Sequence, residues 1–163
     1  MVNNLRTFEA FVAERYSALA RTAALLLGSP TRAEALVQSA LARTYLRWDR
    51  FESLSNAEAY TRTVMVRLAL RWGRRLGRGP QLADAADEVA SCLARLPAAP
   101  RAALVLRCYA RFSEAEAARM LRRRPATIQR RTARAMASLR AAGLLASFDG
   151  SPPTVAAEDW YVR

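Results

Sequence analysis

The feature that most constrains the fold is a helical spacing of apolar residues, which is clearest in "SPTRAEALVQSALARTYLRW", residues 29–48. These apolar positions follow an i, i+3, i+4, i+7 series, so one helix face is expected in a core and the other is free. The positions are Ala33, Leu36, Val37, Ala40, Leu41, Tyr45 and Trp48. Ser29 followed by Pro30 fits an N-cap and N1 pair at the start of this helix.

Two more helices are predicted in the first half of the chain. The first lies in "TFEAFVAERYSALARTAALLLG", residues 7–28, where Thr7 is placed to cap the helix and Gly28 to end it. A third helix is expected to begin at "SNAE", where Ser55 and Glu58 have the spacing of a capping box, and to run to about Gly77.

Short helices are predicted in the second half. The stretch "SEAEAARML" opens with another capping-box pair, Ser113 and Glu116, and Pro125 can occupy N1 of a helix over 125–142. Two helices joined by so short a turn indicate a helix-turn-helix. The low content of breakers, 6 glycines and 7 prolines in 163 residues, favours helices throughout.

These patterns predict an all-α fold of two small helical domains joined by a linker, with the helix-turn-helix in the second domain. The segment "GRGPQLADAADEVAS" interrupts the helical pattern with glycine, proline and acids, which places the boundary near residue 80. The expected limits are 1–78 for the first domain, 79–92 for the linker, 93–145 for the second domain and 146–163 for a loose C-terminal tail.

Charge points to a polyanionic partner. The formal net charge is +12, and all 26 basic residues are arginines. A GC-rich genome would favour arginine over lysine, so only the positions of the arginines carry an argument. Both halves are basic, with 13 arginines against 6 acids in residues 1–80 and 13 against 8 in 81–163. An anionic membrane surface would need a free apolar face, which this chain requires for its core.

The stretch "ARMLRRRPATIQRRTARAMASLR", residues 118–140, holds 8 arginines and no acid. On a helix over 125–142, Arg130 and Arg134 point away from an apolar face, which comprises Ile128, Thr132, Ala135, Met136 and Leu139. In a helix-turn-helix the second helix enters the major groove, where arginine pairs with guanine and glutamine with adenine. A merely solvated basic face is the alternative, and the coincidence with a helix-turn-helix argues against it.

The third helix has a comparable arrangement. Val64, Met65, Leu68 and Trp72 fall on one side, whereas Arg67, Arg71, Arg74 and Arg78 form a separate stripe beside Tyr60 and Thr63. Aromatic side chains such as Trp48, Phe51 and Tyr60 suit stacking with exposed bases. For Trp48 and Trp72, packing between helices is the favoured interpretation.

Other function classes find little support. The chain has no histidine, and Cys92 and Cys108 lack metal-ligand spacing, so buried free thiols, no metal and no cofactor are expected. No paired carboxylates, Gly-rich phosphate loop or nucleophile beside a base indicates an enzyme or a small-molecule substrate. No apolar run reaches a spanning length of about 18 residues and no leader pattern is present, so a cytoplasmic protein without membrane insertion is predicted.

Several stretches, taken in order, resemble the small sigma factors of the extracytoplasmic-function type, group four of the sigma-70 family, in their actinobacterial form. They are "FEAFVAERYSALARTAALLLGSPTRAEALVQSAL", "NAEAYTRTVMVRLALRWGRR", "LARLPAAPRAALVLRCYARFSEAEAARML" and "ATIQRRTARAMASLR". The last is similar to the family's recognition-helix pattern at Thr127, Ile128, Arg134, Ala135, Leu139 and Arg140. The resemblance covers about residues 7–143.

The resemblance implies a protein that binds core RNA polymerase and directs it to promoters by reading −10 and −35 elements. The residues implied for the −35 duplex are Arg123, Arg124, Thr127, Gln129, Arg130, Arg131 and Arg134. Those implied for the opened −10 strand are Asn56, Tyr60, Arg67, Arg71, Arg74 and Arg75, with the loop "RWDRFESLSN" before them. Those implied for core polymerase are Glu34, Ala35, Gln38, Ser39 and Arg43. An anti-sigma factor is a further partner that the family implies.

The chain departs from the family at three places. Its second helix usually carries acids in a D-x-x-Q-E pattern, where Ala35, Gln38 and Ser39 stand here. Asparagine is usual at the position of Arg67, and glycine at that of Arg122. The missing acids leave an alternative open, a sigma-derived DNA-binding regulator with weak or no docking to core polymerase.

Overall fold

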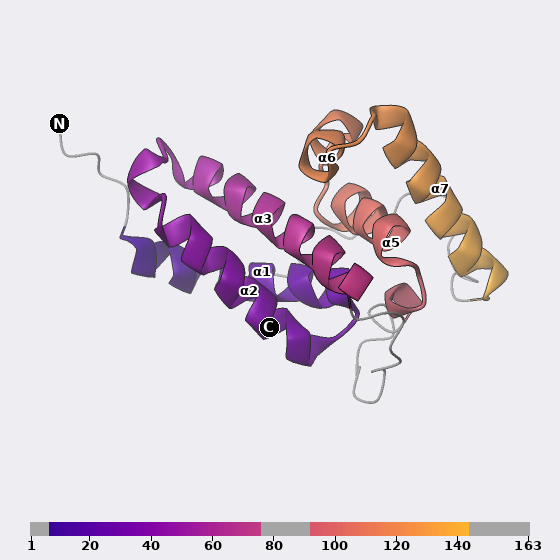
Figure 1. The fold of residues 1–163 in the computed structure, drawn as a ribbon, viewed down its shortest axis with the longest axis horizontal. Coiled ribbons are helices and arrows are strands. Elements are labelled where there is room, and N and C mark those ends of the chain that lie inside the picture. Colours follow the sequence, from indigo (N-terminus) through magenta and orange to yellow (C-terminus); the bar gives the residue numbers. More distant parts are fainter. Residues whose placement is uncertain (1–6, 76–91, 144–163) are drawn as a thin grey trace.

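The computed structural model describes residues 7–75 and 92–143 (Figure 1). All regular elements within these ranges are helical, as the sequence predicted. They are α1 (Phe8–Leu27), α2 (Pro30–Tyr45), the 3-10 turn η1 (Trp48–Arg50), α3 (Leu54–Arg75), α5 (Ala98–Leu104), the π-helical turn η2 (Val105–Tyr109), α6 (Glu114–Leu121) and α7 (Pro125–Ala141). The predicted C-terminal tail and almost all of the predicted linker lie outside the described residues.

Helices α1, α2 and α3 pack against one another as the first helical unit. The Thr7 hydroxyl accepts a hydrogen bond from the Ala10 amide at 3.3 Å, and Gly28 ends α1 with a φ of 63°. Only glycine adopts this left-handed conformation without strain, so its position fixes the turn into α2. Ser29 and Pro30 then start α2 as predicted, although the Ser29 side chain makes no capping hydrogen bond.

The predicted start of α3 is wrong by two residues. Ser53, not Ser55, caps the helix, because its Oγ accepts from the Asn56 amide at 3.1 Å. Glu58 therefore falls one turn inside α3, where its carboxylate accepts from the Arg62 guanidinium at 2.8 Å and 3.0 Å instead of closing a capping box. The earlier start lets Leu54 pack against the core.

The apolar face of α2 is buried as predicted as far as Leu41, but its C-terminal end is not. Tyr45 is 59% exposed and the neighbouring Leu46 is 80% exposed, although the Tyr45 ring still packs edge-on against Phe8 of α1, with ring centroids 5.0 Å apart. Trp48 is half-buried in η1 and packs edge-on against Phe8 at 5.3 Å between ring centroids. Packing is therefore the role the structure gives to Trp48.

The second unit contains the predicted helix-turn-helix. Ser113 and Glu116 form the predicted capping box of α6, with the Ser113 amide donating to the Glu116 carboxylate at 2.7 Å and the Glu116 amide donating to Ser113 Oγ at 3.2 Å. The Ser113 hydroxyl, which donates to the Glu116 carboxylate at 2.7 Å, and the Ser113 amide lower the pKa of Glu116. Helix α6 ends at Arg122, and α7 begins at Pro125.

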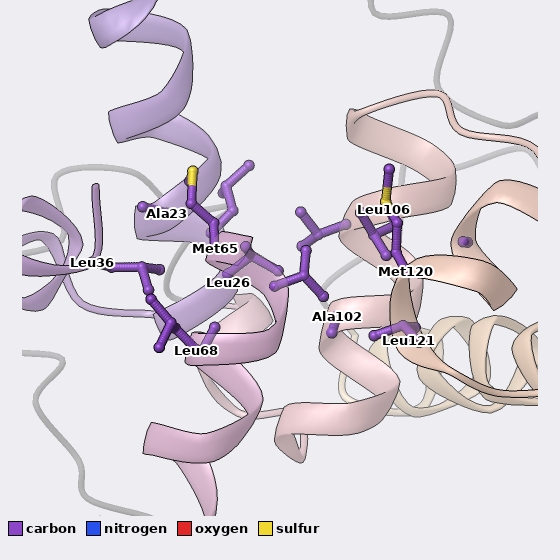
Figure 2. Packing of buried hydrophobic residues seen from close by; sticks show 14 of the residues in the cluster. Ala23, Leu26, Leu36, Met65, Leu68, Ala102, Leu106, Met120 and Leu121 are labelled. Atoms are coloured by element: carbon purple, nitrogen blue, oxygen red, sulfur yellow. The ribbon is translucent and has the colours of Figure 1, made fainter. Parts of the chain in front are cut away.

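One continuous apolar cluster underlies both units (Figure 2). Leu26 of α1 and Met65 of α3 belong to it on one side, and Ala102 of α5 and Leu106 of η2 on the other. Helix α3 packs against α5 and α6, and α1 packs against α5 and η2. The two units thus share a core, an arrangement that the sequence did not reveal.

Both cysteines are free but half-buried, not fully buried as predicted. Burial raises the pKa of the Cys108 thiol, and the nearby Arg107 opposes this shift. Burial therefore favours the protonated form of the Cys108 thiol.

Candidate nucleic-acid interface

The exposed face of α7 carries the residues predicted to read duplex DNA. Ile128, Ala135 and Leu139 are buried on the opposite face, against α5 and α6, whereas Arg130 and Arg134 are exposed. Gln129 is also exposed, and the small residues Ala126, Ala133 and Ala137 between the long side chains are exposed too. The result is a helix surface whose backbone can approach a groove closely.

The turn before α7 forms a basic hollow of about 770 Å³. It is lined by Ala115, Ala118, Arg119, Arg122, Arg123, Arg124, Pro125 and Thr127. The N-terminal end of α7 carries the positive end of the helix dipole, which favours an anion there. Arginines and a helix N-terminus therefore meet at one concave surface suited to phosphate.

Like charges gather at the start of α7. The pKa of Arg131 is lowered by partial burial and by the neighbouring charges of Arg123 and Arg130. Three guanidinium groups held this close on one side of the helix create a positive field that a polyanion would relieve. Arg131 lies at the edge of the exposed face and is half-buried.

The arginine stripe of α3 is the second basic surface. Arg67 and Arg71 are exposed, and Val66 and Ala69 are buried on the core side of the same helix. Asn56 is exposed at the N-terminal end of α3, and Tyr60 is half-buried. Arg74 and Arg75 continue the helix, but their side chains lie outside the described part of the chain.

A chain of aromatic rings runs from the η1 turn to the arginine stripe of α3. Trp48 packs against Phe51, and Phe51 against Tyr60, with ring centroids 6.3 Å and 5.3 Å apart. The guanidinium of Arg47 stands 5.4 Å from the Tyr60 ring centroid. The structure thus brings together two of the predicted stacking residues, Phe51 and Tyr60, and places Arg47, the first residue of the loop "RWDRFESLSN", beside them.

A third surface lies on the solvent side of α2. Glu34, Ala35, Gln38 and Arg43 are exposed, and Ser39 is half-buried. The Gln38 amide donates to the Glu34 carboxylate at 3.2 Å, and Arg43 donates to the Ser39 carbonyl at 2.8 Å. The predicted polymerase-binding residues therefore share one helix face, whose only acid is Glu34.

Arg101 is buried and lies away from the DNA-facing surfaces. Arg101 of α5 is 8% exposed and donates to the carbonyl oxygens of Leu93 and Ala94 at 3.4 Å and 3.2 Å. Burial lowers the pKa of its guanidinium. Arg101 fastens the segment that enters α5, a structural role that composition alone would have counted as basic surface.

Within residues 7–75 and 92–143, no group of three or more histidine, cysteine or acidic side chains is placed to hold a metal ion. None of the helices in the same ranges is long and apolar enough to cross a membrane.

Comparison with known proteins identifies the two units. Residues 11–79 match the family "Sigma-70 region 2", and residues 86–139 match "Sigma-70, region 4". The chain resembles the sigma factor RpoE from Bartonella quintana, solved in complex with the anti-sigma factor NepR, with 25% identity and a TM-score of 0.68. The likeness covers 87% of this chain and 98% of RpoE. No curated protein matches the chain.

The helical fold, the helix-turn-helix and the two arginine-rich faces define a DNA-binding protein that acts in transcription. The chain belongs to the sigma-70 family and is a sigma factor of the extracytoplasmic-function type, which directs promoter-specific transcription initiation. Nothing in the comparison tests the actinobacterial assignment, which stays a prediction.

Proposed function

We propose that the exposed face of α7 and the turn before it read the −35 element as duplex. The residues assigned to this task are Arg123, Arg124, Thr127, Gln129, Arg130, Arg131 and Arg134. The observation that carries the assignment is the division of α7 into a buried apolar face and an exposed basic face within a helix-turn-helix. Arg130 and Arg134 suit base edges, and Arg123 and Arg124 suit phosphates at the mouth of the hollow.

The stripe of α3 is proposed to hold the opened −10 strand. Its residues are Asn56, Tyr60, Arg67, Arg71, Arg74 and Arg75. A single strand is bound by cations along its backbone and by aromatic faces under its bases, and the Tyr60 ring beside Arg67 and Arg71 supplies both kinds of group.

Core RNA polymerase is proposed to dock on α2 through Glu34, Ala35, Gln38, Ser39 and Arg43. With Ala35 and Ser39 in place of acids, the docking is weaker than two carboxylates would give, because fewer charge pairs steer the encounter. The protein acts in the cytoplasm by binding DNA and polymerase, without catalysing a reaction of its own. Its two domains span residues 1–78 and 93–145. The RpoE–NepR complex supports an anti-sigma factor as a further partner.

Two measurements test the proposed function. The tagged protein is incubated with core polymerase and recovered, and the recovered complex is used in run-off transcription. We expect co-purification and a discrete transcript that requires the added protein. A protein that binds duplex DNA but neither retains core polymerase nor yields a transcript would be the sigma-derived regulator instead.

A further inference from the structure

Two buried threonine hydroxyls face each other between α2 and α3, which pack together (Figure 1). Thr44 and Thr61 are both 0% exposed, and their Oγ1 atoms lie 2.8 Å apart although the residues are 17 positions apart in sequence. The buried residues about one turn away on the same helices, Leu41, Ala57 and Met65, are apolar. A hydroxyl buried in such surroundings costs free energy unless it is hydrogen-bonded. The contact is therefore a directional one in a region that otherwise packs by shape.

The two hydroxyls have fewer protons than hydrogen-bonding partners. Thr44 Oγ1 also lies 3.0 Å from the Ala40 carbonyl oxygen, and Thr61 Oγ1 lies 2.8 Å from that of Ala57. Each hydroxyl donates one proton and accepts through its lone pairs. Either Thr44 donates to Ala40 and accepts from Thr61, or Thr61 donates to Ala57 and accepts from Thr44. Both arrangements keep the hydrogen bond between the helices.

This hydrogen bond restricts how α3 can slide along α2. Apolar packing is non-directional and follows the area removed from water, so neighbouring positions along a helix differ little for it. A hydroxyl–hydroxyl bond instead requires an oxygen–oxygen distance of about 2.5–3.0 Å. A shift of about 2 Å along the helix would break the bond even where the apolar contacts re-form.

The first turns of α3 need such a reference, because threonines there also bond to the helix's own carbonyl groups. Thr61 Oγ1 lies within hydrogen-bonding distance of the Ala57 carbonyl, and Thr63 Oγ1 donates to the Ala59 carbonyl oxygen at 2.8 Å. Side-chain bonds to the carbonyl four residues back often bend a helix. The direction of this part of α3 therefore depends on what it packs against.

The strand site proposed above draws on both helices that the threonine pair joins. Tyr60 of α3 directly precedes Thr61, and its ring lies 5.3 Å from that of Phe51 and 5.4 Å from the Arg47 guanidinium, measured from the Tyr60 ring centroid. Arg47 follows the end of α2, and its amide donates to the Thr44 carbonyl at 3.0 Å. Thr44 thus holds Arg47 through its backbone and Thr61 through its side chain.

From these contacts we propose that Thr44 and Thr61 are positioning residues for the −10 strand site, whose hydrogen bond sets where the Tyr60 ring stands relative to Arg47 and Phe51. The proposal rests on the proposed function of the α3 stripe. Both threonines are fully buried, so neither side chain touches the strand. They act through the placement of Tyr60.

The test substitution is Thr61→Val, which removes the hydroxyl and keeps the shape of the side chain. It leaves no hydroxyl unpaired, since Thr44 still donates to the Ala40 carbonyl. Thr22→Val is the matched control, because Thr22 is 2% exposed and its hydroxyl donates within α1 to the Ala18 carbonyl at 2.9 Å. Thr61→Ser keeps the hydroxyl and removes only the methyl group.

Two readouts separate positioning from stability. The surroundings of Tyr60 are followed by fluorine NMR of protein that contains fluorotyrosine, with the Tyr60 resonance assigned from its loss in Tyr60→Phe. Affinity is measured for a random-sequence single-stranded DNA oligonucleotide, because stacking tolerates every base. Tyr60→Leu defines the share of that affinity that depends on the ring. A thermal melt verifies that each variant is folded.

We expect Thr61→Val to shift the Tyr60 resonance and to weaken strand binding about three- to tenfold, near the lower end of what one stacked base contributes. Thr61→Ser and Thr22→Val should match the parent in both readouts, and all melting temperatures should stay within a few degrees of the parent's. In a Tyr60→Leu background, Thr61→Val should cause no further loss of binding. Thr44→Val should repeat the effects of Thr61→Val, and it decides the matter should Thr61→Val fail to fold.

An unchanged Tyr60 resonance in folded Thr61→Val or Thr44→Val would overturn the positioning role. Equal losses of binding in Thr22→Val and Thr61→Val would also overturn it, since the cause would then be a general loosening of the core. A shifted resonance with parental affinity, where Tyr60→Leu itself binds weakly, would show that the strand does not depend on the pair. Parental binding by Tyr60→Leu would instead reject the proposed −10 function, and a shifted resonance would then still support the placement of Tyr60 by the threonines.

Discussion

Helices α3 and α7 present the same chemistry in different surroundings. Both bury one apolar face and place arginines on the other. On α7 the arginines at positions 130 and 134 are exposed at an open surface, whereas on α3 Arg67 is bonded to the second domain. The difference shows that an exposed arginine on a basic helical face can also hold a second domain in place.

The largest effect is expected from removing the two exposed arginines of α7. Arg130→Ala together with Arg134→Ala should weaken −35 duplex recognition, because each lost bidentate base contact costs roughly 1–3 kcal/mol. If the contacts are to phosphate instead, the salt slope should flatten by about one unit per arginine on all sequences. Arg140→Ala is the matched control on the same helix. Equal binding of a matched promoter by the double variant and the control would show that the recognition face is misassigned.

The next prediction separates the two arginines of α3. Arg71→Ala should reduce binding to a −10 single strand and lower the salt slope by about 0.7, without changing the interdomain distance. Arg67→Ala should weaken strand binding too, and it should also lengthen the distance between the two domains, because it removes the hydrogen bond to the Met120 carbonyl. Paired spin labels on α3 and α7 measure this distance. Both should keep the parent's melting temperature within a few degrees. Identical distances for the two variants would contradict the dual role of Arg67.

A smaller effect is expected on α2, where no DNA is involved. Ala35→Asp with Ser39→Glu should tighten binding to core polymerase, since exposed charge pairs each contribute about 0.2–1 kcal/mol. The gain should shrink as salt rises, because exposed charges are screened within about 8–10 Å at ~0.1–0.15 M. A competition titration of parent and double variant at two salt concentrations measures it. Weaker binding by the double variant would mean that the chain docks through another face.

The smallest predicted effect concerns the turn before α7. Arg122 caps α6 with a φ of 50°, a left-handed conformation that an L side chain adopts at a cost. Arg122→Gly should therefore raise the free energy of unfolding by about 0.5–1 kcal/mol while slightly weakening duplex binding through the lost charge. Urea unfolding of the two proteins measures this, and a destabilised glycine variant would show that the Arg122 side chain contributes more than its backbone strain costs.

Elements with a local cause were predictable from sequence. Gly28, Pro125 and the Ser113–Glu116 capping box act over a few residues, so their spacing alone located the helix ends. The start of α3 was misplaced because Ser53 and Ser55 both fit the preference for a cap, and only the packing of Leu54 decides between them. The family usually has glycine at the position of Arg122, and the left-handed φ of this residue gives the physical reason.

What depends on distant contacts was not predictable. Nothing in the spacing of Arg67 indicates the Met120 carbonyl, and nothing in the composition separates the buried Arg101 from the arginines at the surface. Arg119 was likewise missed, although it lines both the hollow before α7 and the groove against α3. The Arg67 hydrogen bond and the groove lined by Arg119 depend on how the two domains meet.

The most direct test maps transcription start sites from pooled genomic DNA with core polymerase and three proteins: the parent, the Arg130→Ala, Arg134→Ala variant and the Arg71→Ala variant. The account predicts that the parent directs initiation at sites sharing two upstream elements. The first variant should lose dependence on the −35 sequence, and the second should retain it while opening fewer −10 sites. Two results would contradict this account. The parent would give no start sites beyond those of core polymerase alone, or both variants would lose the same sites.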